Sequence, residues 1–235
     1  NPIITENHQQ LMDAYASKDA TVKAAVQSQI YGGDNLQNDG SFGAASVGRI
    51  TANYINGPAT TVNGIDLYIK YEDDYANGVI SAGFEANYVA KYSVDAYMKG
   101  SVQIAGAYEC AGFFNINNPC RPMPEIKGKF FLNYQEDQHN FYGAINYISA
   151  YDDRRSTAAG CSKTLTDGVC TEIAAHTTVD ATYTYSWDDQ FDISFSVYNL
   201  TDELPPFTVW EMNYDAYTHS PLGRFVKAGF TYRMQ

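Results

Sequence analysis

The sequence predicts an all-β protein whose antiparallel strands form a transmembrane β-barrel, preceded by a short helical segment. Three observations carry this prediction. From about Val47 onward, apolar and polar residues alternate with the period of two that is typical of strands with two different faces. Many of the apolar runs end in Tyr or Trp, as the aromatic girdles of membrane barrels do. The connections between runs are alternately short and long, as in barrels with short turns on one rim and long loops on the other.

The first part of the chain has a different pattern. Between residues 5 and 31, apolar residues recur at helical spacing and predict two short helices. The expected N-caps and stop signal are Thr5, Asp19 and Gly32-Gly33. We therefore divide the chain into a loop with short helices over residues 1–47 and a strand region over residues 48–235.

Seven alternating runs are long enough to cross a bilayer, which takes ~9–11 residues in a tilted strand. They are 48–72, 79–92, 125–135, 139–151, 174–186, 190–200 and 223–233. A soluble sandwich also alternates, but the aromatic run ends and the loop asymmetry favour a membrane barrel, in which closure satisfies every backbone group. Seven is an odd number of crossings. Splitting the first run at Gly57-Pro58 would give eight, and the sequence leaves this choice open.

Composition excludes several classes of protein. The chain has 15 Lys and Arg against 27 Asp and Glu, a net charge of −12, which argues against a nucleic-acid partner. Aromatic residues make up 14% and charged residues 18%, the reverse of an intrinsically disordered chain. No run approaches the ~18 apolar residues of a membrane helix. The chain starts at Asn1 without an apolar leader, so we expect either a processed chain or part of a longer one.

The four cysteines fall into two close pairs, Cys110/Cys120 and Cys161/Cys170. Three pairings are formally available, but closing the shorter loops costs the least entropy, so neighbour pairing is favoured. No Cys-x-x-Cys spacing indicates a metal site. We expect two disulfides and therefore an oxidising compartment.

Three stretches carry a family pattern. They are Asn63-Gly64-Ile65-Asp66-Leu67; Pro124-Glu125-Ile126-Lys127-Gly128 with paired strands ending at Tyr151-Asp152-Asp153; and Val197-Tyr198-Asn199-Leu200-Thr201-Asp202-Glu203 with Pro205-Pro206, Tyr214-Asp215-Ala216-Tyr217 and Ser220-Pro221-Leu222-Gly223-Arg224. In order and spacing they resemble the C-terminal part of TonB-dependent receptors, the energised outer-membrane transporters of Gram-negative bacteria. One departure is the end of the chain, Tyr232-Arg233-Met234-Gln235, because members of that family usually finish on an aromatic residue.

The resemblance implies a barrel of about 22 strands with a plug inside it. This chain would supply about seven of those strands and begin within an extracellular loop, which would explain the odd number of crossings. The remaining strands and the plug would lie in the same or a separate chain. The implied function is active import of a small-molecule nutrient across the outer membrane, with long loops outside the cell, strands in outer-membrane lipid and TonB acting through the plug.

The sequence contains no catalytic constellation, so we expect no enzyme activity, no cofactor and no metal. The four His residues are scattered, and the acidic clusters, Glu72-Asp73-Asp74 among them, fall in expected short turns. Ligand binding is the better hypothesis. The candidates in the long loops are Phe113, Phe114, Trp210, Tyr214, Asp215 and Tyr217. Aromatic faces beside amides and acids suit a sugar, whereas an anionic ferric siderophore would be attracted by clustered cations.

Two alternatives remain open at this stage. The loop aromatics could only pack the loops together. The whole chain could be a small self-contained outer-membrane barrel, or a surface adhesin or structural protein, without active transport.

Overall fold

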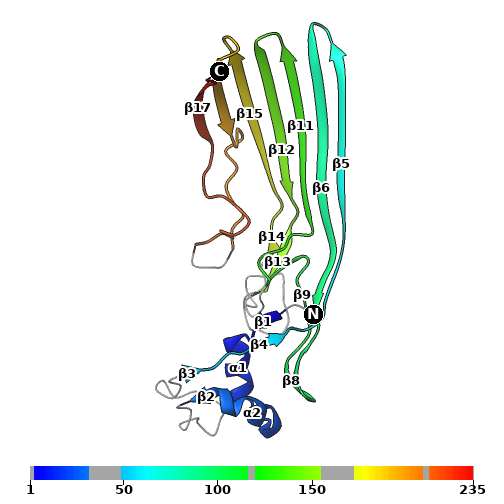
Figure 1. Ribbon diagram of the computed structural model, residues 1–235, viewed down its shortest axis with the longest axis vertical. Helices are drawn as coiled ribbons and strands as arrows, with labels where there is room; N and C mark the ends of the chain where they lie inside the picture. Colours follow the sequence, from blue (N-terminus) through cyan, green and yellow to red (C-terminus); the bar gives the residue numbers. More distant parts are fainter. Residues whose placement is uncertain (1–2, 32–48, 116–119, 155–171, 209–211, 235) are drawn as a thin grey trace. The chain divides into compact units, whose positions relative to one another are not determined.

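The computed structural model describes residues 3–31, 49–115, 120–154, 172–208 and 212–234. The chain forms two compact units. The first contains residues 1–62 and 91–110, and the second contains residues 63–90, 111–116 and 120–235, each as far as they are described. Figure 1 labels their elements. Among the described residues, neither helix is long and apolar enough to span a bilayer.

The first unit contains the two predicted short helices, α1 (His8–Tyr15) and α2 (Ala20–Val26). Its other elements are β1 (Ile3–Thr5), the 3-10 helix η1 (Gln27–Gln29), β2 (Ile30–Tyr31), β3 (Arg49–Ile50), β4 (Tyr54–Asn56), β7 (Tyr97–Lys99), β8 (Val102–Ala105) and β9 (Tyr108–Glu109). Asp19 caps α2 as predicted, by accepting the N–H groups of Thr21 and Val22. The prediction that Thr5 caps α1 is wrong. Asn7 is the cap, because its side-chain oxygen accepts the N–H groups of Gln9 and Gln10.

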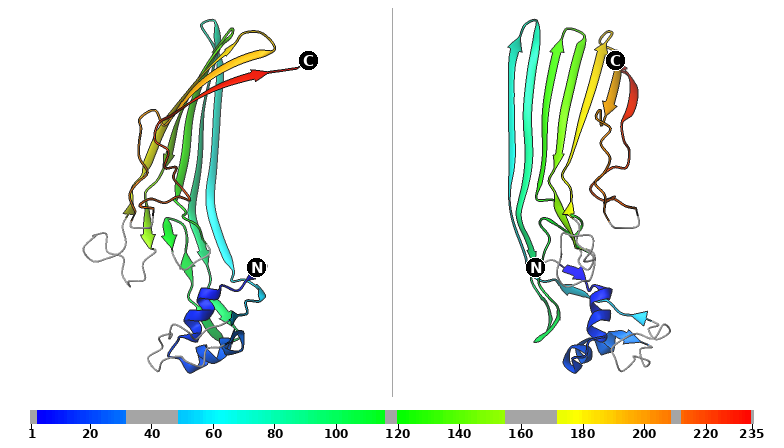
Figure 2. Two further views of the ribbon diagram at one scale, coloured as in Figure 1. Left: turned by 90° about the vertical axis from the view of Figure 1, so that its left-hand side faces the viewer. Right: turned by 180° about the vertical axis from the view of Figure 1, so that it is seen from behind.

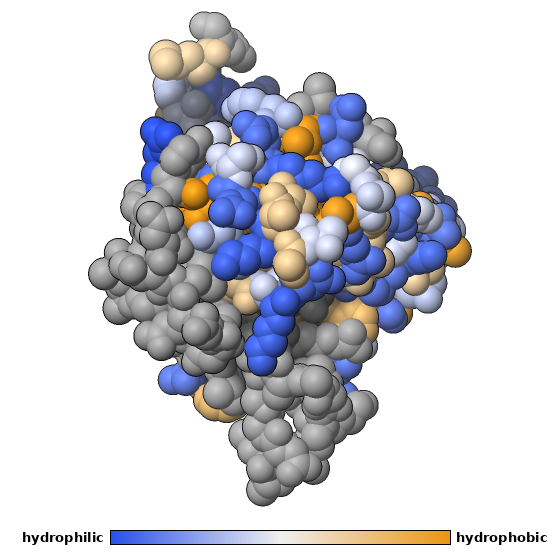
Figure 3. All heavy atoms as spheres, turned by 90° about the horizontal axis from the view of Figure 1, so that it is seen from below, coloured by the Kyte–Doolittle hydropathy of each residue, from blue (hydrophilic) through white to orange (hydrophobic). Residues whose placement is uncertain are grey.

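A small hydrophobic core holds the first unit together. Its buried members include Leu11 and Tyr15 of α1, Val26 of α2, and Tyr97 and Ile104 of the hairpin of β7 and β8, so both helices pack on this hairpin. The predicted stop signal at Gly32-Gly33 lies outside the described residues. Figure 3 shows one face of the protein, on which the coloured residues are mainly hydrophilic with scattered apolar residues.

The second unit is dominated by one antiparallel sheet. Its path contains seven strands, as predicted: β5 (Thr60–Tyr75), β6 (Gly78–Val94), β11 (Ile126–Glu136), β12 (His139–Ile148), β15 (His176–Ser186), β16 (Phe191–Tyr198) and β17 (Phe225–Tyr232). Each strand neighbours the next one along this path, and the ends of β5 and β6 contribute to the first unit. Figures 1 and 2 show the strands side by side in a curved sheet. In the described residues the sheet does not close, as expected for a portion of a barrel.

Two sequence-based boundaries need correction. The run predicted as one strand over 48–72 is broken near Gly57-Pro58, and only β5 joins the main sheet, so the number of sheet strands stays at seven. The acidic cluster Glu72-Asp73-Asp74 lies in β5 and not in the turn, because the strand continues to Tyr75. The turn itself is then only two residues long, and Ala76 adopts a left-handed φ of 53° to close it.

The register of the sheet places the apolar residues of neighbouring strands on one face. Phe130 of β11 lies opposite Phe84 of β6 and Ile145 of β12. The same face continues through β15, β16 and β17, where Phe195 faces Tyr183 and Ala228. No second layer covers this face within the described residues. Phe130 is 45% exposed, Phe195 51% and Ile65 of β5 64%. A continuous exposed apolar face of this kind is what lipid contact requires.

The opposite face of the sheet is polar and cross-linked by side-chain hydrogen bonds. Asn146 of β12 donates to Asp180 of β15 over 2.9 Å, and Thr182 donates to Ser196 of β16 over 3.0 Å. Because a strand alternates its side chains, this face is the interior of a barrel whose exterior is apolar. The predicted alternation is thus confirmed in space.

Aromatic rings gather at the short-turn end of the sheet. Ring pairs join neighbouring strands there, with centroid distances of 4.9 Å for Phe141 and Tyr183 and 4.8 Å for Phe191 and Tyr232, and Tyr75 of β5 meets Tyr134 of β11 at 6.3 Å across the end of β6. Amphipathic rings at one rim are typical of a girdle at a membrane–water boundary.

The third of the family-like stretches forms a tight turn after β16. Asn199 has a left-handed φ of 52°, and its side-chain amide both donates to the Glu203 carbonyl and accepts the Glu203 N–H. Asp202 accepts the N–H of Arg224 over 2.7 Å, which joins this turn to the start of β17. A Cβ on Gly223 would lie 2.5 Å from the Asp202 carboxylate, so the close approach requires glycine. The turn fixes where the loop between β16 and β17 begins and ends.

Candidate functional site

The cysteine prediction is confirmed for one pair. Cys110 and Cys120 are joined in a disulfide, and Cys110 is completely buried. The pairing closes a short loop around β10 (Phe113–Asn115), as the entropy argument predicts. The second predicted pair, Cys161 and Cys170, lies outside the described residues.

A small mixed sheet organises the long loops of the second unit. β10 pairs in parallel with β13 (Tyr151–Arg154), and β13 pairs antiparallel with β14 (Glu172–Ile173). Three side chains from the three strands form a buried cluster, namely Phe114, Tyr151 and Ile173. Tyr151 of this cluster also forms hydrogen bonds through its hydroxyl group.

Tyr151, Asp215 and His219 form a buried hydrogen-bonded group. The Tyr151 hydroxyl donates to Asp215 Oδ2 over 2.5 Å and lies 3.1 Å from His219 Nε2. Asp215 is 1% exposed, and its other oxygen accepts the N–H of Tyr217 over 2.9 Å. Burial first, and then the bond to Asp215, raise the pKa of Tyr151 well above its ordinary value. The tyrosine therefore stays protonated and acts as a donor.

Two imidazoles meet beside this group. The rings of His176 and His219 pack edge to face with centroids 5.0 Å apart, and both side chains are buried. Burial, reinforced by the neighbouring His176, lowers the pKa of His219 to about 4, so its ring is neutral at pH 7. His176 Nε2 and His219 Nδ1 are buried atoms without a hydrogen-bond partner in the described structure. No group of three or more metal-ligating side chains occurs in the part of the chain that the structure describes.

The predicted ligand-binding residues divide into buried and exposed members. Phe114 and Asp215 are buried, and Phe113 is partly buried in β10. Tyr217 is 65% exposed, with its ring edge-on to Phe114 at 6.1 Å and the Arg121 guanidinium 4.8 Å from its centroid. The structure thus brings Phe114, Asp215 and Tyr217 together around the β10–β13 sheet.

The other two candidates are Tyr214 and Trp210. Tyr214 is partly buried and forms a β-bridge with Phe207, whose ring is 60% exposed. Trp210 lies outside the described residues. A ligand-binding role for the six residues remains a prediction.

Sequence reasoning missed Tyr151, His176 and His219 as members of this cluster. The histidines look scattered along the chain, and the Tyr151–Asp215 bond spans 64 residues. Side-chain contacts between separate loops bring the segments together, and no local spacing indicates them.

Comparison with known proteins was made against families, curated proteins and solved structures. A family model described as "TonB dependent receptor-like, beta-barrel" matches residues 25–200. No curated protein matches the chain. Among solved structures, a variant of the ferric enterobactin receptor from Pseudomonas aeruginosa is similar over 72% of this chain and 31% of that chain, with 12% sequence identity and a TM-score of 0.37. The chain spans about a third of the length of that receptor.

Proposed function

The chain belongs to the family of TonB-dependent receptor-like β-barrels, and we propose that it forms the C-terminal strands and loops of an outer-membrane transporter that actively imports a nutrient. The observation that carries the proposal is the two-faced sheet. Its exposed apolar face suits outer-membrane lipid, and its polar face suits the interior of a plugged barrel. The other partners in this proposal are the remaining strands, a plug segment and TonB acting through the plug.

The orientation follows from the lengths of the connections. The turns after β5, β11 and β15 are short, whereas the connections after β6, β12 and β16 are long. In outer-membrane barrels short turns face the periplasm and long loops face outward. We therefore propose that the cluster of Tyr151, Asp215 and His219 lies on the extracellular side. There it would shape the loops and present exposed rings such as Tyr217 to the solute.

For the solute we favour an oligosaccharide over a ferric siderophore. Exposed aromatic rings can stack on the C–H faces of a sugar. The chain is strongly acidic, with a net charge of −12, and the Arg121 guanidinium already lies against the Tyr217 ring. The net negative charge opposes the attraction of an anionic chelate.

The test compares uptake in cells with and without the complete gene. Labelled neutral oligosaccharides and a ferric catecholate are supplied to both strains, with and without a protonophore. Gene-dependent accumulation that the protonophore abolishes supports the proposal. Gene-dependent entry that survives the protonophore indicates a passive channel and contradicts it. A folded, membrane-extracted particle of only 26.1 kDa would contradict it too, in favour of a small self-contained barrel or a structural protein.

A further inference from the structure

The first unit contains a buried carboxylate, Glu6, whose two oxygens both accept hydrogen bonds from other residues of the unit. Glu6 is 4% exposed, and its Oε1 accepts the Tyr97 hydroxyl over 2.5 Å and lies 3.3 Å from Lys99 Nζ. Its Oε2 accepts the backbone N–H of Asn53 over 2.9 Å and the side-chain amide of Gln29. Burial alone would raise the pKa of Glu6, but these hydrogen bonds outweigh burial and hold the pKa below its ordinary value. Glu6 therefore stays charged and fixes the ring of Tyr97.

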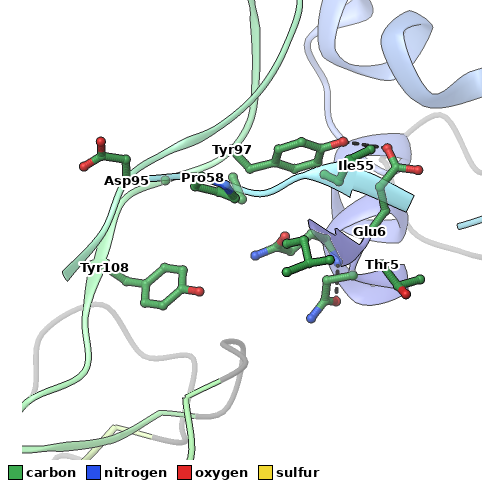
Figure 4. Close-up of a pocket in the computed structure, with 12 residues that line it drawn as sticks. Thr5, Glu6, Ile55, Pro58, Asp95, Tyr97 and Tyr108 are labelled. Carbon is green, nitrogen blue, oxygen red and sulfur yellow. Dashed lines mark hydrogen bonds between the residues drawn. The ribbon is translucent and has the colours of Figure 1, made fainter. Parts of the chain in front are cut away.

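The fixed Tyr97 ring forms one wall of a pocket within the first unit (Figure 4). The pocket holds about 170 Å³ and is enclosed by four segments of that unit. Its apolar lining comes from Ile4, Ile55, Pro58, Ala105, Tyr97 and Tyr108. Its polar lining comes from Thr5, Glu6, Asn7, Gln10 and Asp95. Neither the disulfide loop nor the Tyr151 cluster contributes to it.

The volume of the pocket limits the ligand to about one small ring. A cavity of ~150 Å³ accommodates benzene, so about 170 Å³ suits one six-membered ring and excludes a bulky chelate. An aromatic wall supplies a surface for C–H groups, and a few convergent polar groups fix orientation, which is the usual composition of a small-molecule site.

The charge of the lining disfavours an anionic ligand. None of the twelve lining residues is Lys or Arg, whereas Glu6 and Asp95 are acidic. Lys99 is held by Glu6 and by the side-chain oxygen of Gln29. Burial raises the pKa of Tyr108 to about 12, so its hydroxyl remains a donor at pH 7. The Tyr108 hydroxyl as a donor, and the Gln10 side-chain amide as both donor and acceptor, match the hydroxyl groups of a sugar.

We propose that this pocket binds one neutral sugar residue, between the rings of Tyr97 and Tyr108 and the side chain of Gln10. The site is separate from the loop residues discussed above. Its biological meaning rests on the proposed function, because it would capture part of an imported oligosaccharide. The binding event itself requires neither energy nor TonB.

The experiment measures binding to the protein expressed from its complete gene and purified in detergent. The probes are the methyl glycosides of glucose, galactose, mannose, xylose and N-acetylglucosamine, followed by saturation-transfer NMR. We expect at least one glycoside to bind saturably below about 10 mM. Tyr108→Ala should weaken that binding about tenfold, and Gln10→Ala should weaken it several-fold. Gln10 is only partly buried in α1, where alanine is well tolerated, so its variant keeps the test decisive if the Tyr108 variant does not fold.

The matched control is Tyr54→Ala. Tyr54 lies in β4 of the same unit, is 82% exposed and does not line the pocket, so its removal should leave binding unchanged. The inference is overturned if no glycoside binds at that concentration, or if the Tyr54 and Gln10 variants behave alike. Binding of a ferric catecholate with the same dependence on Tyr108 would also overturn it. If the sugar binds but energised uptake is absent, the pocket assignment is supported and the transporter function is contradicted. If uptake occurs but no sugar binds in the pocket, the transporter function is supported and the pocket assignment is contradicted.

Discussion

The hydroxyl of Tyr151 donates a 2.5 Å hydrogen bond to the carboxylate of Asp215, across 64 residues of sequence. The bond joins β13 to the loop that precedes β17. Asp215 in turn organises its own loop, because its side chain accepts the N–H of Tyr217 and its carbonyl accepts the N–H of His219. One buried pair thus holds two long connections together.

Tyr151→Phe tests this pair. The change removes the donor and leaves a buried carboxylate short of a partner, so the loop should lose about 1–3 kcal/mol of stability. Hydrogen exchange of the His219 amide, which is bonded to the Asp215 carbonyl at 3.0 Å, reports the loss. Tyr217→Phe is the control, because its ring is mostly exposed and should leave that exchange unchanged. Equal protection in the two variants would mean that the hydroxyl of Tyr151 does not stabilise the loop.

The buried imidazole of His219 makes the same loop sensitive to acid. The ordinary pKa of His is 6.5, and in the folded loop burial and His176 lower the pKa of His219 to about 4. Above pH 6.5 the ring is neutral whether the loop is folded or open. Between pH 6.5 and about 4 only the open loop takes up the proton, so the folded loop loses stability as the pH falls; below about 4 the loss stops. Protection of the His219 amide, corrected for the intrinsic pH dependence of exchange, should decrease on the order of 100-fold over this range.

His219→Gln is the matched variant for the pH experiment. Glutamine does not titrate, so the variant should lose most of the change in protection between pH 6.5 and 4. The other charged or titratable groups that influence the ring are His176, Asp215, Tyr151 and Lys127. An unchanged pH profile in His219→Gln would assign the effect to one of these groups and contradict the role of His219.

The sheet could be predicted from sequence because its signal is local and repeated. A strand with one face in lipid must alternate along its own length, so each run shows its pattern without knowledge of its neighbours. The ends of the strands carry a weaker sequence signal. Glu72-Asp73-Asp74 has the composition of a turn, yet it continues β5, because acidic residues at the rim of a sheet remain solvated.

The loop site could not be predicted for the opposite reason. Asp215 and Tyr217 were selected as polar and aromatic loop residues, but the burial of Asp215 depends on a partner in β13. His176 and His219 carry no spacing signal, since the packing of separate loops sets their contact. The N-cap of α1 shows the same limit on a smaller scale. Thr5 and Asn7 are both good caps, and only the backbone at Asn7 places its side chain on the free N–H groups.

Removal of the disulfide tests the loop around β10. Replacing Cys110 and Cys120 by Ala together frees a short loop in the unfolded chain and should cost about 3 kcal/mol. Limited proteolysis should then cut between residues 111 and 125 faster than in the unaltered protein, while cleavage near β16 stays the same. If both sites are cut at unaltered rates, the cross-link does not restrain this loop.

The central claim is that one face of the sheet contacts lipid and the other lines the interior. A nitroxide label is placed at each position of β16 (Phe191–Tyr198) in the reconstituted complete protein, and collision rates with oxygen and with a water-soluble nickel complex are measured. The account predicts a period of two, with oxygen collisions highest at Ile193 and Phe195 and lowest at Ser194 and Ser196. Oxygen accessibility without alternation, or greatest nickel accessibility at Ile193 and Phe195, would contradict it.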